Sequence, residues 1–232
     1  MPRRPSQLQR ATLAMPRLIT RRGFGYLTLG ATATATGLIS NSWLPVAAAQ
    51  AQDRTQLGSV AKMQKLSGAT HGTDSRSLAI GDKIYRDDLL WTRSHGQLRI
   101  DLLDGSNLSL GENAEVALDD SMLGGGGSAF MRVLSGAFRF SSGGGEKAAT
   151  PPKIETPFAV LSLRGTEVYG AKFGGALGFL VTSGQVEVSN DSGSVVLNEG
   201  EGTEVSSRSS ALEAPKKWGA PKVKRIKALL HY

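Results

Sequence analysis

Apolar and polar residues alternate with a period of two along much of the chain between residues 53 and 210, as they do in half-buried β-strands. The clearest case is residues 155–173, where the alternation stops at Gly165 and then resumes. β-branched and aromatic residues on both sides of a glycine predict a strand, a tight bend or bulge, and a second strand. Nowhere between residues 53 and 210 does a helical apolar period persist over three turns.

Glycine and aspartate mark the turns expected between these strands. Residues 78–85 predict a strand that turns at Gly81 and Asp82, because glycine adopts positive φ and aspartate can bond to nearby backbone. Asp104 and Gly105 separate two alternating runs, which predicts a β-hairpin.

A glycine followed by alternating apolar residues recurs along the chain. The units are SGAFRF at 135–140, RGTEVYG at 164–170, SGQVEV at 183–188 and EGTEV at 201–205. Their spacing is only roughly regular, so they are not a strict solenoid repeat. In the third unit Gly184 predicts a bend, and Val186 belongs to the strand that follows it.

Short strands with frequent turn signals predict an all-β fold, as a roll, a short β-solenoid or a sandwich. The polar run 67–74 and the glycine-rich runs 124–127 and 141–152 are expected to be loops. We expect the all-β domain to span residues 53–210.

Charge is distributed unevenly along the chain. The formal net charge is +7, but residues 1–52 and 216–232 each hold six basic residues and no acid. The body between them is mildly acidic, which argues against nucleic-acid binding by the body. The absence of cysteine excludes disulfides and thiolate metal sites.

The first 52 residues predict an export signal. Arg21 and Arg22 precede a long uncharged run of modest hydrophobicity, and small-residue cleavage patterns end at Ala49 and Ala51. The pattern resembles twin-arginine signals, which implies a periplasmic or secreted protein. The alternative is an uncleaved membrane anchor, since the run is long enough to span a bilayer. Met15 is an alternative to Met1 as the true start.

Residues 211–232 form a compositionally separate basic tail. It could lie on an anionic surface, cap the domain or stay disordered, and its unpatterned composition favours a loosely ordered, solvated segment.

Few residues suggest chemistry. The three histidines, at positions 71, 95 and 231, lack the spacing of a metal site, so we expect no metal and no cofactor. The acidic pairs at 87–88 and 119–120 could bind calcium or act as acid and base, but strand-end turns explain them better. No Gly-x-Ser-x-Gly elbow is present, so we expect no catalytic residues.

Arg164 has two interpretations. Its guanidinium could clamp an anion beside the Gly165 bend, or it could tie turn carbonyls or a carboxylate within the fold, and the second is favoured. Gly165 and Thr166 are expected to determine backbone shape.

The order of these motifs resembles the FecR domain over roughly residues 60–205. The motifs are Gly-Asp at 81–82, Asp-Gly-Ser at 104–106, Ser-Gly-Ala-Phe at 135–138, Thr-Pro-Phe-Ala-Val at 156–160, Arg-Gly-Thr-Glu-Val at 164–168, Ser-Gly-Gln-Val-Glu-Val at 183–188 and Glu-Gly at 199–200. The resemblance implies a periplasmic all-β module. Its best-known members relay a receptor signal through a cytoplasmic anti-sigma segment, which this N-terminus does not resemble, so a stand-alone exported form is expected.

Three functions remain open at this point. The favoured one is a non-enzymatic sensory or binding module of the cell envelope, recruiting a protein through exposed strand edges or loops near residues 124 and 144. The second is a structural or glycan-associated envelope protein held by its basic tail. The third is an exported enzyme acting on polysaccharide. A membrane contact would arise only through an uncleaved signal.

Overall fold

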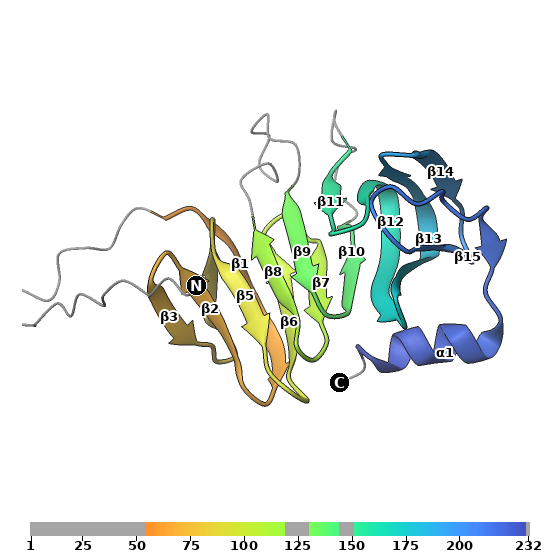
Figure 1. The fold of residues 1–232 in the computed structure, drawn as a ribbon. Helices are drawn as coiled ribbons and strands as arrows, with labels where there is room; N and C mark the ends of the chain where they lie inside the picture. The colour runs from red at the N-terminus through yellow and green to blue at the C-terminus, as the bar shows by residue number, and fades with distance from the viewer. Residues whose placement is uncertain (1–53, 119–129, 144–150, 231–232) are drawn as a thin grey trace, which may run out of the picture. The chain divides into compact units, whose positions relative to one another are not determined.

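The computed structural model describes residues 54–118, 130–143 and 151–230. The chain divides into two units, residues 1–48 and 49–232, and the described residues all lie in the second. That unit is built mainly of strands with one helix in its described part, which confirms the all-β prediction (Figure 1).

Sixteen strands are described, and most are short. The first eight are β1 (Gln56–Gln64), β2 (Ser67–His71), β3 (Asp74–Ser77), β4 (Lys83–Tyr85), β5 (Leu89–Thr92), β6 (Gln97–Leu102), β7 (Asn107–Leu110) and β8 (Glu115–Leu118). The others are β9 (Met131–Ser135), β10 (Phe138–Ser141), β11 (Lys153–Glu155), β12 (Val160–Phe173), β13 (Ala176–Asn190), β14 (Gly193–Leu197), β15 (Glu201–Val205) and β16 (Lys216–Lys217). The helix α1 spans Ala220–Ala228.

All the strands belong to one hydrogen-bonded sheet with two halves. The first half runs β3-β2-β5-β8-β9-β11-β12, and the second runs β12-β10-β7-β6-β1-β4. Pairing is antiparallel except between β9 and β11. The long hairpin β12–β13 belongs to both halves, because β12 pairs with β11 near its start and with β10 near its end.

The core lies between the two halves. Leu90, Val116 and their neighbours from the first half belong to one buried cluster with Leu98 and Phe138 from the second. The rings of Phe130, beside β9, and Phe140, on β10, lie 5.1 Å apart. Alternate residues of each strand enter this cluster, which is why the period of two is so clear in the sequence.

Two local predictions are wrong. Residues 67–71 and 74–77 form the hairpin β2–β3 rather than an irregular turn region. Polar side chains obscured these strands, since β3 is an edge strand with little buried surface. In the predicted strand 78–85 only residues 83–85 form a strand, because the residues before them connect the two halves of the sheet.

The prediction of a loosely ordered tail is also wrong for residues 216–230. β16 pairs with β15, and α1 packs on the outer face of the second half beside β12 (Figure 1). Trp218, Ile226 and Leu230 are buried there in a second, smaller apolar cluster with Tyr169 and Leu180.

Candidate binding edge and its structural supports

The bend in the β12–β13 hairpin is built by two facing glycines. Gly165 has φ +57° and Gly184 has φ +76°, values that side chains disfavour. The strand register shifts between Arg164 and Glu167, as in a β-bulge. A Cβ on Gly184 would lie 2.1 Å from the carbonyl oxygen of Gly165, so the two backbones approach too closely for any other residue.

Thr166 fixes the bulge from inside. Its hydroxyl accepts a hydrogen bond from the Arg164 N–H at 2.9 Å and donates to the Gln185 carbonyl at 2.9 Å. Its own N–H donates to the Ser142 hydroxyl at 2.8 Å. The side chain is buried, so these bonds satisfy groups that water does not reach. Thr166 therefore has the shape-determining place expected for it.

Arg164 does not take the internal structural place favoured for it. The residue is exposed, and its guanidinium has no hydrogen bond or ion pair with any residue in the described part of the chain. The anion-clamp interpretation stays a prediction.

The other motif residues serve turns and core. Gly81 and Gly105 have φ +90° and +80°, and Asp82 accepts a hydrogen bond from the Ala79 N–H at 2.8 Å. Asp104 accepts hydrogen bonds from the N–H and hydroxyl of Ser106 at 2.9 and 2.5 Å. Val186 is fully buried in the main core.

Asp88 is the most enclosed charged group in the described chain. Its carboxylate accepts hydrogen bonds from Arg54 at 2.5 Å, from Arg76 at 2.7 Å and from the Tyr85 N–H at 2.9 Å. Burial alone would raise the pKa of Asp88, but the hydrogen bonds from Arg76, Tyr85 and Arg54 outweigh it, so the pKa lies below its usual value. Its neighbour Asp87 is exposed. The pair does not act as a unit; one carboxylate holds the fold and the other faces solvent.

A second cluster links β10 and β12. Arg139 donates to Glu167 at 2.6 Å, and the Tyr169 hydroxyl donates to the same carboxylate oxygen at 3.0 Å. Burial opposes ionisation of Glu167, yet the hydrogen bond and charge of Arg139 lower its pKa. Burial, followed by the charge of Glu167, raises the pKa of Tyr169. Arg139, Glu167 and Tyr169 each bond to another member of the cluster, so the cluster ties β10 to β12.

The two described histidines lie at turns. His71 Nδ1 is 3.4 Å from the Asp87 carbonyl oxygen, and His95 Nδ1 is 3.7 Å from a Glu112 carboxylate oxygen. Among residues 54–118, 130–143 and 151–230, no three histidine or acidic side chains gather as a metal site would require. His231, the acidic pair 119–120, the loop tips at 124–127 and 144–145, and Arg21 and Arg22 lie outside the described residues.

Four strands of the described sheet have a neighbour on one side only: β3, β4, β14 and β16. β3 carries Asp74 and Arg76, β4 carries a lysine, and β16 consists of two lysines. Charges of this kind discourage pairing with another chain. β14, with the sequence GSVVL, is the longest of the four and has no charge. Its Val196 side chain is 44% exposed.

The open edge of β14 presents unpaired backbone groups. The Leu163 N–H on β12 donates to the Pro152 carbonyl at 3.0 Å, on the side away from β13. Val186 of β13, which lies opposite Leu163, therefore directs its N–H and C=O groups to its other side, toward Leu197 on β14. Antiparallel pairing alternates along a strand, so Ser194 and Val196 direct their N–H and C=O groups outward. β14 is thus a template for one more strand.

Trp218 is the structural residue that the sequence interpretation missed. Its indole lies over Gly202 and Gly178, where an added Cβ would come within 2.5 and 2.9 Å of it, and it meets the Phe173 ring edge-on at 5.7 Å. The signal was present: Pro221 suits the first turn of a helix, and Val223, Ile226 and Leu230 follow at helical spacing.

The family model described as FecR protein matches residues 88–187. The matched segment is therefore similar to a FecR domain, as the order of its motifs predicts. The match runs from the buried Asp88 to Glu187 on β13 and includes the bend at Gly165 and Gly184. It leaves Gly81 and Asp82 outside. The FecR family is regulatory rather than enzymatic, and its members are envelope-associated.

Two solved structures resemble the fold, both of a protein described as a putative anti-sigma factor from Parabacteroides distasonis ATCC 8503. One, at 2.50 Å resolution, is 16% identical with a TM-score of 0.48, and the other, at 1.65 Å, is 17% identical with a TM-score of 0.47. In each comparison the match covers 59% of this chain and 62% of the other. No curated protein matches the sequence. None of the helices in the described residues has the length and apolarity to cross a membrane.

Proposed function

We propose that this FecR-type module is a non-enzymatic sensory or binding protein of the periplasm, and that it recruits an extended segment of a partner protein by strand addition at β14. The observation that carries the proposal is the uncharged open edge of β14, where Ser194 and Val196 present unpaired backbone groups. Added strands gain main-chain hydrogen bonds from such an edge and specificity from alternate side chains.

The side chains beside β14 should favour particular residues in a partner strand. Val196 lies opposite Glu187 of β13, which in turn lies opposite Ser162 of β12. All three side chains belong to the outer face of the first half. A partner strand would therefore place an apolar residue beside Val196, while its next residue on that face would meet polar groups.

The enclosed carboxylates support a non-catalytic role. Asp88 is held by two arginines, and Glu167 by Arg139 and Tyr169, which leaves neither free to exchange a proton with a substrate. The export signal predicted around Arg21 and Arg22 supports the periplasmic location. Cell fractionation with mass determination of the mature N-terminus tests that location, and recovery of the full-length chain in the cytoplasm would contradict it.

Strand addition is tested by a photoreactive amino acid placed at Val196, with Ser75 on the charged edge β3 as the matched position. We expect a discrete crosslinked partner in envelope fractions from position 196 and none from position 75. Ser194→Pro should abolish the crosslink, because it removes an outward N–H that no strand of this domain uses. Equal crosslinking from both positions, or a crosslink that survives Ser194→Pro, would refute β14 as the site.

Val195→Pro serves as the control for folding. The Val195 backbone pairs with Val188 inside the sheet, so proline there removes a ladder hydrogen bond. Thermal unfolding should show that Val195→Pro is clearly destabilised and that Ser194→Pro melts close to the parent protein.

A further inference from the structure

One side of the domain combines lysines with exposed leucines. We call it the lysine–leucine rim and define it as Lys65, Leu66, Lys224, Lys227 and Leu229. Leu66 is 54% exposed and Leu229 is 37% exposed, although most leucines of the domain are buried. The three lysines are exposed as well.

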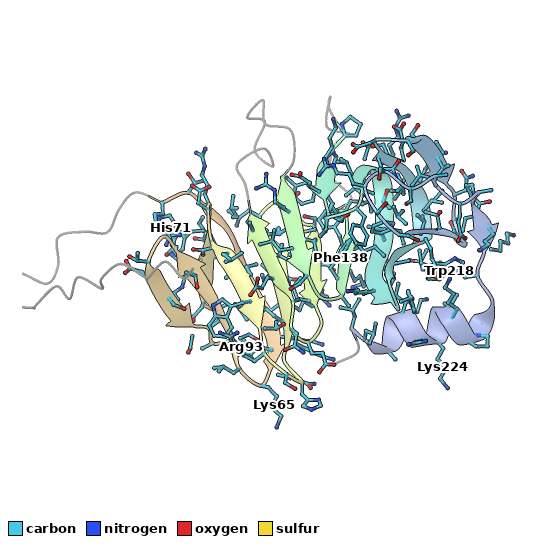
Figure 2. The ribbon with its side chains drawn as sticks, viewed as in Figure 1. Lys65, His71, Arg93, Phe138, Trp218 and Lys224 are labelled. Atoms are coloured by element: carbon cyan, nitrogen blue, oxygen red, sulfur yellow. The ribbon has the colours of Figure 1, made fainter. Side chains whose placement is uncertain are left out.

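Two distant parts of the chain form this rim. Lys65 stands at the β1–β2 turn with φ +58°, and Leu66 follows it. The C-terminal end of α1 lies across a cavity of about 300 Å³ whose lining includes Gln64, Gly96 and Leu229. Lys65 and Lys224 extend toward the same side of the molecule in Figure 2.

The packing of α1 holds the backbone of Lys224 and Lys227 in place. Trp218, Ile226 and Leu230 attach the helix to the sheet, so its apolar face is used internally. The opposite face presents Lys224, whereas Lys227 is exposed at the side of the helix with its ammonium 5.8 Å from the centre of the Tyr169 ring. Residues 216–230 include no acid. At the rim Glu112 is an acidic neighbour, and it is engaged by His95. The rim is thus positive on a body, residues 53–215, with more acids than bases.

We infer that the lysine–leucine rim docks the domain on an anionic phospholipid surface. Lysines near a membrane are attracted by acidic headgroups, and exposed leucines among them can enter the interfacial region. A soluble anionic polymer would use the lysines and leave the leucines without a role. This inference is independent of strand addition.

Docking of the rim on a bilayer would leave the β14 edge free for strand addition. α1 packs against the half of β13 that contains Leu180, whereas β14 pairs with the other half, Val186–Asn190. In Figure 1, β14 and α1 accordingly lie at opposite ends of the β12–β13 hairpin. The bilayer and a strand partner could therefore bind together.

The chain has no cysteine, so a single introduced thiol reports on one position. The test uses the full chain with Leu66→Cys carrying an environment-sensitive dye, and vesicles of equal parts phosphatidylglycerol and phosphatidylcholine. Leu103→Cys is the matched control, because Leu103 is 64% exposed and bonds to Leu57, at the far end of β1 from Gln64. We expect a blue shift, and quenching by nitroxide-labelled lipid, at position 66 only.

The contribution of charge is tested with two double variants. The rim pair is Lys65→Gln with Lys224→Gln, and the control pair is Lys83→Gln with Lys153→Gln, which removes the same charge outside the rim. Each rim lysine should contribute about fivefold to vesicle affinity at low ionic strength, so the rim pair should lose about 25-fold and the control pair little. Equal responses at positions 66 and 103, equal responses to pure phosphatidylcholine, or equal losses in both pairs would overturn the inference. The inference would also be overturned if dextran sulfate, a soluble polyanion, reproduced the full blue shift of the dye at position 66.

Discussion

Gly184 lies directly against Gly165, with the position of a Cβ on Gly184 only 2.1 Å from the Gly165 carbonyl oxygen. This contact allows the β12–β13 hairpin to change direction and to serve both halves of the sheet. The bend matters because β14 and α1 are attached to the parts of β13 on either side of it. A change at the bend should therefore alter stability and the placement of both proposed surfaces.

Gly184→Ala should destabilise the domain by more than about 2 kcal/mol, because it adds a backbone collision to the cost of a positive φ. Gly165→Ala should cost only about 1 kcal/mol, since its φ is +57° but no atom lies within 4 Å of the added Cβ. Gly175→Ala is the control, with open space and no positive φ. Denaturant unfolding measures all three, and a different order would contradict the proposed geometry of the bend.

Asp88→Asn should lower the free energy of unfolding by about 3 kcal/mol, because it leaves Arg54 and Arg76 without their buried carboxylate. Asp87→Asn is the matched control one residue away, at a side chain that is 63% exposed. Asparagine also tolerates the φ of +62° at that position. We expect a change of under about 0.5 kcal/mol there. Equal losses in the two variants would show that the arginine pair does not depend on Asp88.

Asp88 should also make stability depend on pH. Its pKa in the folded protein is lowered, so the ionised carboxylate contributes stability above the unfolded pKa of about 3.9, and this contribution is lost as the pH falls through the folded pKa. Unfolding measured from pH 7 downward should thus show a loss below about pH 4. The loss should be smaller in Asp88→Asn. Identical pH profiles would assign the acid sensitivity to other carboxylates, such as Glu167.

Trp218→Ala should release α1 from the sheet. The indole fills the space above Gly178 and Gly202, so its removal should cost about 3 kcal/mol of docking. Hydrogen exchange should show lost protection in residues 220–230 while β6 and β7 stay protected. Leu229→Ala, at a partly exposed side chain at the C-terminal end of α1, is the control. Full protection of α1 in Trp218→Ala would contradict this expectation and would mean that Ile226 and Leu230 alone hold the helix on the sheet.

Arg164→Gln should change the free energy of unfolding by less than about 0.5 kcal/mol, because the guanidinium has no partner among the described residues. Thr166→Val is the contrasting variant, since it removes a buried hydroxyl with two hydrogen bonds. A large loss in Arg164→Gln would restore the structural interpretation of this arginine.

Sequence patterns alone predict the all-β class, the turns at Gly81, Gly105 and Gly184, and the bend at Gly165. These features depend on local chemistry: the period of two, and the ability of glycine to take a positive φ. The hairpin β2–β3 escaped prediction because β2 has small and polar residues and the edge strand β3 is polar, so neither shows the apolar period.

The roles of these elements in the fold depend on contacts between residues far apart in the sequence. The sequence does not show which strands become edges, so the uncharged β14 was indistinguishable from strands inside the sheet. Nor does it show that Asp88 meets Arg54 and Arg76, which are 34 and 12 residues away. The basic tail became a docked helix because Gly178 and Gly202 leave room for Trp218, a fit between distant residues that no local pattern contains.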